Sequence, residues 1–297
     1  SLTIIGVVAA ITLPSLTGNI NERTWNTQRK ALYSRMSQAI SLMPALNGYG
    51  TTDENAAETF VTAGLSKVLK INNICDNEHL KDCGIPEKLT PTSGGTMSIP
   101  TKLSELNELF TGSYTDAAGL VYENPQKNID TKAAAFETAN GESIVVFYNP
   151  HCTNDMNEIT WHYPQPKMCA NFVYDLNGSK GPNTVGKDIG LITVFNATDS
   201  AVVAPMPSSS TNAAKTGVSW QNAAKLCTSS DNETRMPNID ELSAMLINKN
   251  IINLTESVGF WSGSVYNSNK AWHIETVYGT RFSGDKNTPR YVRCIKR

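Results

Sequence analysis

The first 13 residues, SLTIIGVVAAITL, are apolar or small and carry no charge. After Pro14 the apolar positions recur at steps of three, four or their multiples, in a stripe formed by Leu16, Ile20, Leu32, Met36, Ile40 and Met43. This spacing predicts an amphipathic helix, so residues 1 to about 47 are predicted to form one long helix with a kink or break at Pro14. The uncharged run is shorter than the ~20 residues that span a bilayer, and we interpret it as the tail of a longer apolar helix.

Later patterns alternate between helix and strand. Helical spacing covers residues 55–70 and, more briefly, residues 103–110. Three runs rich in β-branched and aromatic residues predict strands at 144–148, 169–176 and 189–195. Near the C-terminus the sequence predicts a helix after Ser219, a second helix capped by Asn238 with Glu241 three residues on, and aromatic-rich strands at 260–264, 271–274 and 291–294.

Residues 201–217, AVVAPMPSSSTNAAKTG, have the composition of a linker, with two prolines, a Ser/Thr run and small side chains. We therefore predict four segments: an N-terminal helix (1–50), a globular domain (51–200), the linker (201–217) and a C-terminal domain (218–297). The expected fold class is α+β, with the long helix packed on an antiparallel sheet and a smaller α+β domain after it.

Length and charge agree with this division and exclude one class of partner. The chain has 297 residues, which suggests about two domains, and 40% hydrophobic residues, enough for a buried core. Lys and Arg together number 25 against 27 Asp and Glu, a net charge of −2. Without a basic surplus to neutralise phosphates, a nucleic-acid partner is not expected.

Six cysteines and no CxxC pair favour disulfides formed in an oxidising compartment. Six cysteines allow 15 pairings. We favour the sequential pairs Cys75–Cys83, Cys152–Cys169 and Cys227–Cys294, because each lies within one predicted substructure. The alternative is a zinc site, which would recruit His151, Cys152, His162 and Cys169 at a spacing that matches no standard site.

The segment from Ile4 to Pro14, IIGVVAAITLP, resembles the mature N-terminus of type IV pilins and of the related pseudopilins of type II secretion. The resemblance implies that Gly6, Ala9, Ala10 and Pro14 lie in an assembly helix that packs in the core of a helical homo-oligomeric filament. It implies that the assembled protein belongs to an extracellular pilus at the cell surface. Before assembly, the helix would anchor the subunit in the inner membrane, where it meets the assembly machinery. It also implies a methylated N-terminus and an assembly glutamate ahead of Ser1. The alternative within this resemblance is a minor pseudopilin of a type II secretion system.

A second resemblance to pilin-like proteins lies in residues 175–188, DLNGSKGPNTVGKD, which follow the form D-x-N-G-x-x-G-P-N-x-x-G-x-D. Asp175, Asn177, Asn183 and Asp188 offer oxygen ligands of the kind that calcium takes, and no other cofactor is expected. The simpler interpretation is a network of Asx turns without metal, since the EF-hand ligand pattern and its terminal glutamate are missing.

The last 80 residues resemble the C-terminal lectin-like domain of bacterial collagen-like adhesins, which is related in fold to C-type lectins and formylglycine-generating enzymes. The matching motifs are Arg235–Leu242 (RMPNIDEL) and Tyr291–Lys296 (YVRCIK), with departures at Met236, Asn238 and Gly263. The resemblance also pairs Cys227 with Cys294.

We expect this domain to bind a glycan or another partner and not to catalyse a reaction. A calcium lectin needs a carboxylate or amide where Met236 stands, and both cysteines are committed to one disulfide. His273 is expected to be structural. An enzyme on this scaffold is the less favoured alternative. Trp220, Trp261 and Trp272 are expected to fill the core, and the expected contact residues on loops are Tyr266, Asn267, Asn269, Tyr278, Arg281 and Asp285.

Overall fold

The computed structural model of the chain describes residues 23–50, 54–92, 94–107, 113–115, 121–123, 130–150, 152, 167–196, 201–205, 216–228, 234–252, 254, 258–276 and 280–296. The predicted assembly residues Gly6, Ala9, Ala10 and Pro14 lie outside these ranges, as do His151, His162 and Tyr278. The architecture mixes helices and antiparallel sheets, so the predicted α+β class is confirmed.

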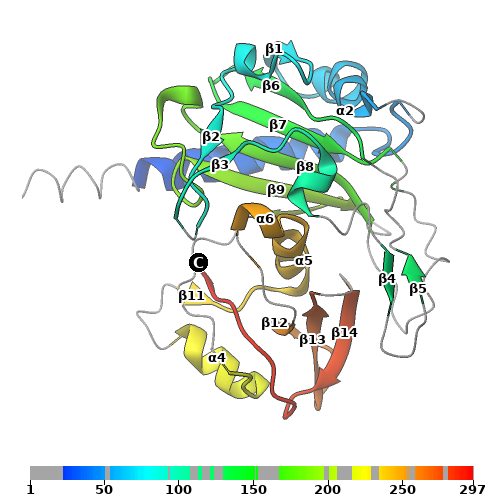
Figure 1. Ribbon diagram of the computed structural model, residues 1–297, viewed down its shortest axis with the longest axis vertical. Helices are drawn as coiled ribbons and strands as arrows, with labels where there is room; N and C mark the ends of the chain where they lie inside the picture. The colour runs from blue at the N-terminus through cyan, green and yellow to red at the C-terminus, as the bar shows by residue number, and fades with distance from the viewer. Residues whose placement is uncertain are drawn as a thin grey trace, which may run out of the picture.

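A six-stranded antiparallel sheet forms the centre of the molecule (Figure 1). Its strand order is β1 (Ile71–Cys75), β6 (Ala134–Thr138), β7 (Ser143–Tyr148), β8 (Lys167–Asp175), β9 (Ile189–Asn196) and β10 (Ala201–Pro205). The predicted strands at 144–148, 169–176 and 189–195 are confirmed as β7, β8 and β9, three of the four interior strands. Every residue of β7 is buried, because both faces of the sheet are covered.

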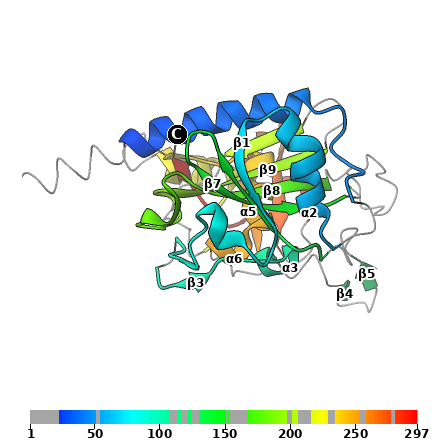
Figure 2. The same ribbon diagram turned by 90° about the horizontal axis from the view of Figure 1, so that it is seen from above.

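The helix of residues 23–42 covers the first face (Figure 2). Its predicted stripe is confirmed from Leu32 onward: Leu32, Met36 and Ile40 are buried in one core with sheet residues such as Phe136 and Val146. Residues 23–47 of the predicted helix lie in the described ranges, and the helix ends at residue 42, short of the predicted end.

A second helical segment joins this first face. It runs through α2 (Ala56–Thr59), a π-helical turn η1 (Phe60–Gly64) and a 3-10 turn η2 (Leu65–Lys67), and so confirms most of the helix predicted at 55–70. The Phe60 ring stacks on Tyr148 of β7, with ring centroids 4.3 Å apart. This contact ties the segment to the middle of the sheet.

The opposite face carries helices from the C-terminal part of the chain. α5 (Ile239–Ile247) and α6 (Lys249–Ile252) lie there beside α3 (Leu103–Leu106), the 3-10 helix η3 (Leu80–Cys83) and a hairpin of β2 (Lys88–Leu89) and β3 (Met97–Ser98). Leu242 and Leu246 of α5 are buried in the same core as Val173 and Leu191 of the sheet. The predicted capping box of Asn238 and Glu241 starts α5.

The rest of the C-terminal unit extends from α5. A three-stranded antiparallel sheet is formed by β12 (Gly259–Val265), β13 (Lys270–Glu275) and β14 (Thr280–Asp285). Helix α4 (Trp220–Thr228) and the short pair β11 (Thr234–Arg235) and β15 (Ile295–Lys296) complete it. A second small hairpin, β4 (Ser113–Thr115) and β5 (Val121–Glu123), belongs to the first part of the chain.

Two boundary predictions are wrong. Residues 201–205 form the edge strand β10, paired with β9, so the linker does not start at residue 201; residues 206–215 lie outside the described ranges. An edge strand accepts a proline such as Pro205, because one side of it donates no ladder hydrogen bonds. The strand predicted at 291–294 reduces to one bridge between Tyr291 and Phe260, and the paired strand β15 follows it.

The C-terminal unit is not held away from the sheet. A buried polar network joins them: the amides of Asn171 (β8) and Asn248 donate to each other's carbonyl oxygens at 2.8 and 3.0 Å. The hydroxyl of Thr193 (β9) donates to Asn171 Oδ1 at 2.6 Å. All three residues have 0% exposure, so each hydrogen bond replaces one that water would otherwise make.

Three disulfides join Cys75 to Cys83, Cys152 to Cys169 and Cys227 to Cys294, which is the predicted sequential pairing. The bond between Cys152 and Cys169 uses both thiols of the alternative zinc site, so that alternative is wrong. In the described part of the chain no helix is long and apolar enough to cross a membrane.

Replacing Asn248 by alanine should destabilise the whole molecule, since Asn171 and Thr193 then lose buried partners. We expect a loss of about 1–3 kcal/mol in the free energy of unfolding, measured by urea denaturation. The matched control is Asn222→Ala on exposed α4, expected to change stability by less than about 0.5 kcal/mol. Equal effects of the two substitutions would show that the network contributes nothing.

Replacing Cys227 and Cys294 together by alanine should cost more stability than replacing Cys75 and Cys83. The bonds close loops with sequence separations of 67 and 8, and the longer loop restricts the unfolded chain more. We expect about 4 kcal/mol for the longer loop and about 2.5 kcal/mol for the shorter one. Thermal unfolding under non-reducing conditions measures both, and peptide mapping checks the pairing.

Candidate functional site

The loop between β8 and β9 is the first of two candidate places. It begins with Asp175 at the end of β8 and ends with Asp188 just before β9. The backbone N–H of Leu176 donates to the carbonyl oxygen of Asp188 at 3.0 Å and closes the loop. Gly178 has a φ of +64°, a conformation that glycine adopts at little cost, so the chain can turn sharply after β8.

Most polar groups in this loop satisfy one another. Asp175 Oδ1 accepts the N–H of Asn177 at 3.1 Å, and the Asn177 amide donates to the Gly181 carbonyl at 2.8 Å. The two oxygens of Asp188 accept the N–H groups of Asn183 and Thr184, both at 2.8 Å. The predicted network of Asx turns is therefore present.

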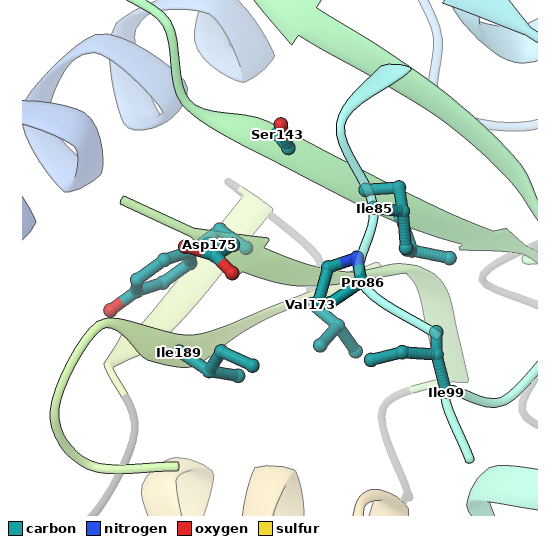
Figure 3. A pocket seen from close by; sticks show the side chains of 9 residues that line it. Ile85, Pro86, Ile99, Ser143, Val173, Asp175 and Ile189 are labelled. Carbon is teal, nitrogen blue, oxygen red and sulfur yellow. The ribbon is translucent and has the colours of Figure 1, made fainter. Parts of the chain in front are cut away.

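Three oxygens of the loop are nevertheless left over. Asp175 Oδ2, Asn177 Oδ1 and Asn183 Oδ1 are buried and have no hydrogen-bond partner. Burial, and secondarily the charge of Asp188, raise the pKa of Asp175 to about 7. Asp175 also lines a small cavity whose other walls are mostly apolar, among them Pro86 and Ile189 (Figure 3). All four residues predicted for calcium thus lie in one closed loop, and three of them carry an unused oxygen.

The loop also contacts the helix of residues 23–42. Arg29 Nη2 donates to the carbonyl oxygens of Lys187 at 2.6 Å and Gly186 at 3.2 Å. In these two hydrogen bonds Arg29 binds backbone carbonyl groups of the loop and not the carboxylates of Asp175 and Asp188. The position of the loop is thereby coupled to that of the helix.

The second candidate place is the far end of the β12–β13 hairpin, which we call the hairpin-tip surface and define as Trp220, Val265, Tyr266, Asn267, Asn269, Trp272, Asp285 and Lys286. Val265 and Tyr266 are 51% and 45% exposed, unusual for large hydrophobic side chains. Tyr266 meets the half-buried Trp272 edge to face, with ring centroids 5.3 Å apart. Exposed aromatic rings beside polar groups are typical of recognition surfaces.

Lys286 organises the hairpin-tip surface. Its ammonium group lies 4.9 Å from the ring centroid of Trp220 and donates to the carbonyl oxygens of Asn267 and Ser268 at 3.1 and 3.0 Å. Asn267 Oδ1 in turn accepts the N–H groups of Asn269 and Lys270. The turn is therefore held in one shape.

Four of the six predicted contact residues gather at this surface: Tyr266, Asn267, Asn269 and Asp285. Strand pairing explains the grouping, since Lys270 opposes Asp285 and the N–H of Lys286 donates to Asn269. Sequence reasoning missed Trp272 and Trp220, which it assigned to the core. Only Trp261 is fully buried, and the other two are half-buried.

Arg281 is not a surface contact residue, and that prediction is wrong. Its Nη2 forms an ion pair with Asp240 Oδ1 at 2.7 Å, and its Nε donates to Ser243 Oγ at 2.8 Å. Its guanidinium also lies 5.7 Å from the ring centroid of Phe195 in β9. Arg281 therefore helps to join the C-terminal unit to the sheet.

His273 lies in the interior of the C-terminal unit. Its Nε2 is 3.2 Å from Glu275 Oε1, and its ring packs edge to face on Trp261 and stacks on Phe282. Burial lowers its pKa below the usual 6.5, and Arg290 adds to this while Glu275 opposes it. These contacts place His273 among structural groups.

No group of three or more His, Cys, Asp or Glu side chains suited to a metal occurs in the described ranges. The β8–β9 loop offers two carboxylates and two amides, and only the two carboxylates belong to the residue types of such a group. Comparisons with known proteins found no matching family model and no matching curated protein.

Acid should destabilise the protein through His273. Because its folded-state pKa is lowered, the unfolded state binds the proton first, and stability is lost as the pH falls below about 6.5. The slope attributable to this group is at most about 1.4 kcal/mol per pH unit. Thermal melts from pH 7.5 to 5 should show a smaller loss for His273→Gln than for the native protein. Parallel curves would contradict this.

Proposed function

We propose that this chain is a structural subunit of an extracellular filament of the type IV pilus kind. The observation that carries the proposal is the change from an uncharged segment to an amphipathic helix in the N-terminal part of the chain. Residues 1–13 are uncharged, whereas the helix of residues 23–42 buries its apolar stripe against the sheet and exposes charged residues such as Arg23 and Lys30. An apolar segment ahead of such a helix is available to pack with the same segment of other subunits.

The repeat of one such contact explains why a filament is the expected assembly. A subunit added by the same rotation and translation each time forms an open helix unless the rotation closes a ring. Burial of the uncharged segments among subunits supplies the driving force, at about 25 cal/mol per Å² of apolar surface. The inner membrane would hold the same segment before assembly.

The C-terminal unit is proposed to act in adhesion. It lies on the opposite side of the sheet from the helix of residues 23–42 (Figure 1). Its hairpin-tip surface offers Tyr266 and the partly exposed Trp272 as faces for a sugar ring, with Asn269 and Asp285 as hydrogen-bonding neighbours. Tyrosine and tryptophan bring a large contact area at a small cost in side-chain entropy. A glycan is therefore the proposed ligand class.

Removal of the apolar segment tests the filament proposal. A chain that begins at Thr24 should remain monomeric, while the full chain forms fibres, as seen by electron microscopy and size-exclusion chromatography. Fibres from the shortened chain would contradict the proposal. Long stable fibres of the full chain alone support a pilin, whereas their absence would favour the alternative of a minor pseudopilin.

Point substitutions test adhesion better than removal of residues 218–297, because that deletion would uncover the apolar face beneath α5. Tyr266→Ala and Trp272→Ala should each reduce attachment of fibres to glycan-coated surfaces by about tenfold or more. Leu226→Ala, which removes another exposed apolar side chain, is the matched control and should leave attachment unchanged. Undiminished attachment of both tip variants would refute the assignment.

A further inference from the structure

We propose that a basic patch at one end of the molecule binds the anionic headgroups of a lipid bilayer before the subunit enters a filament. The basic patch combines residues from the helix of residues 23–42 and from the β8–β9 loop: Arg23, Arg29, Lys30, Lys180 and Lys187. The inference rests on the proposed function in one respect, because it takes the uncharged segment to be held by a membrane before assembly.

One hydrogen-bonded contact joins the two segments of the basic patch. Arg29 Nη2 donates to the backbone carbonyl oxygens of Gly186 and Lys187, so the loop is held against the helix. Arg23 and Lys30 are seven residues apart and therefore lie on one side of the helix, two turns from each other. The start of the helix and the β8–β9 loop lie at the same end of the molecule in both views (Figure 1 and Figure 2).

The charges of the basic patch are not cancelled by described acidic side chains. Among the described residues, no ion pair or hydrogen bond is formed by the exposed side chains of Arg23, Lys30, Lys180 and Lys187. The two acids of the loop, Asp175 and Asp188, are buried. The patch is thus locally positive, although the whole chain has a net charge of −2.

The place of the basic patch in the sequence favours a lipid surface as its partner. Residues 1–50 contain four basic residues and only one acid, Glu22, and Arg23 follows the uncharged residues 1–13 by ten positions. When an apolar segment lies in a bilayer, the residues that follow it come close to the headgroups. Clusters of Lys and Arg at such a position are attracted to anionic lipids, over a range of about one Debye length, ~8–10 Å.

The chemistry of the basic patch fits many separate phosphates better than one small anion. Lysine presents a point charge on a flexible stem, so Lys30, Lys180 and Lys187 can each meet a different headgroup. A small anion needs donors that converge on one point, as in bidentate binding by arginine, and Arg29 already binds backbone carbonyl groups. A contact of this kind is weakened by salt and is readily broken, as withdrawal of the subunit into a filament requires.

The test measures flotation of the full chain with two kinds of vesicle, at low and at high salt. One kind contains only neutral phosphatidylcholine, and the other also contains anionic phosphatidylglycerol. The uncharged segment should bind both kinds regardless of salt, whereas the basic patch should add binding only to anionic vesicles and only at low salt. Equal binding to both kinds would overturn this proposal and leave the filament proposal standing. Preference for anionic vesicles by a chain that forms no fibres would support the patch and count against the filament.

A triple variant locates the contact. Lys30→Gln, Lys180→Gln and Lys187→Gln together should weaken binding to anionic vesicles at least tenfold, because each lysine near an anionic surface contributes about a fivefold factor. Binding to neutral vesicles should not change. Unchanged affinity for anionic vesicles would overturn the assignment. Loss of binding to soluble polyglutamate in this variant, without any preference of the native chain for anionic vesicles, would assign the patch to an acidic protein instead and also overturn it.

The matched control removes the same number of charges outside the basic patch. Lys102, Lys225 and Lys270 are exposed, the first just before α3 and the others on α4 and β13. Their joint replacement by glutamine should leave binding to both kinds of vesicle like that of the native chain. Equal losses in the two triple variants would show an effect of net charge alone and overturn the patch. Equal melting temperatures of the native chain and both variants confirm that folding is unchanged.

Discussion

The central sheet must be covered on both faces, and this requirement determines the rest of the architecture. Strands such as β7 are buried at all of their positions, so neither face can be left to water. The helix of residues 23–42 and the segment beginning at α2 cover one face, and α5 with α6 covers the other. Antiparallel sheets often leave one face solvated; here the second face is closed by α5, which begins at Ile239, after all six strands of the sheet.

The C-terminal unit is therefore part of the core of the first domain and not an appendage. The sequence pattern indicated two separate domains, because hydrophobic periodicity reports local structure and not the packing of distant segments. Asn171 looks like a polar residue on a strand, and Asn248 like a helix terminus; nothing in either neighbourhood indicates that the two amides pair with each other. Such long-range polar pairing specifies one docking position, since any displacement leaves buried groups unpaired.

The elements that sequence predicted well are those with strong local signals. Strands β7, β8 and β9 are runs rich in β-branched and aromatic residues, and α5 starts with a capping box whose Glu241 also pairs with Arg235 at 2.6 Å. Strands β1, β6 and β10 escaped prediction. The edge strand β1 contains Asn72 and Asn73, the edge strand β10 ends in a proline, and the interior strand β6 begins with two alanines, which are uncommon in strands. An edge strand needs fewer apolar residues and fewer backbone donors than a central one, so its pattern resembles that of a loop.

The candidate sites, like the helices and strands, were predicted best where the signal is local in the sequence. The sequence indicated the oxygens of the β8–β9 loop, which lie within residues 175–188, and half of the hairpin-tip surface, chiefly the neighbouring residues Tyr266, Asn267 and Asn269. It could not show which oxygens the turns leave unused, nor that Arg281 points toward the sheet. The two tryptophans of the hairpin-tip surface, Trp220 and Trp272, were assigned to the core, since a small unit normally has to bury its tryptophans.

The network of Asn171, Thr193 and Asn248 also has a mechanical consequence. A pull applied at Tyr266 passes along β12 and β13 to α5, and from there through side-chain hydrogen bonds to β8 and β9. The tension enters strands that are bonded on both sides, where many hydrogen bonds share it. Such a unit yields less under tension than one tethered by a flexible segment, and its hairpin-tip surface keeps a constant orientation relative to the helix of residues 23–42.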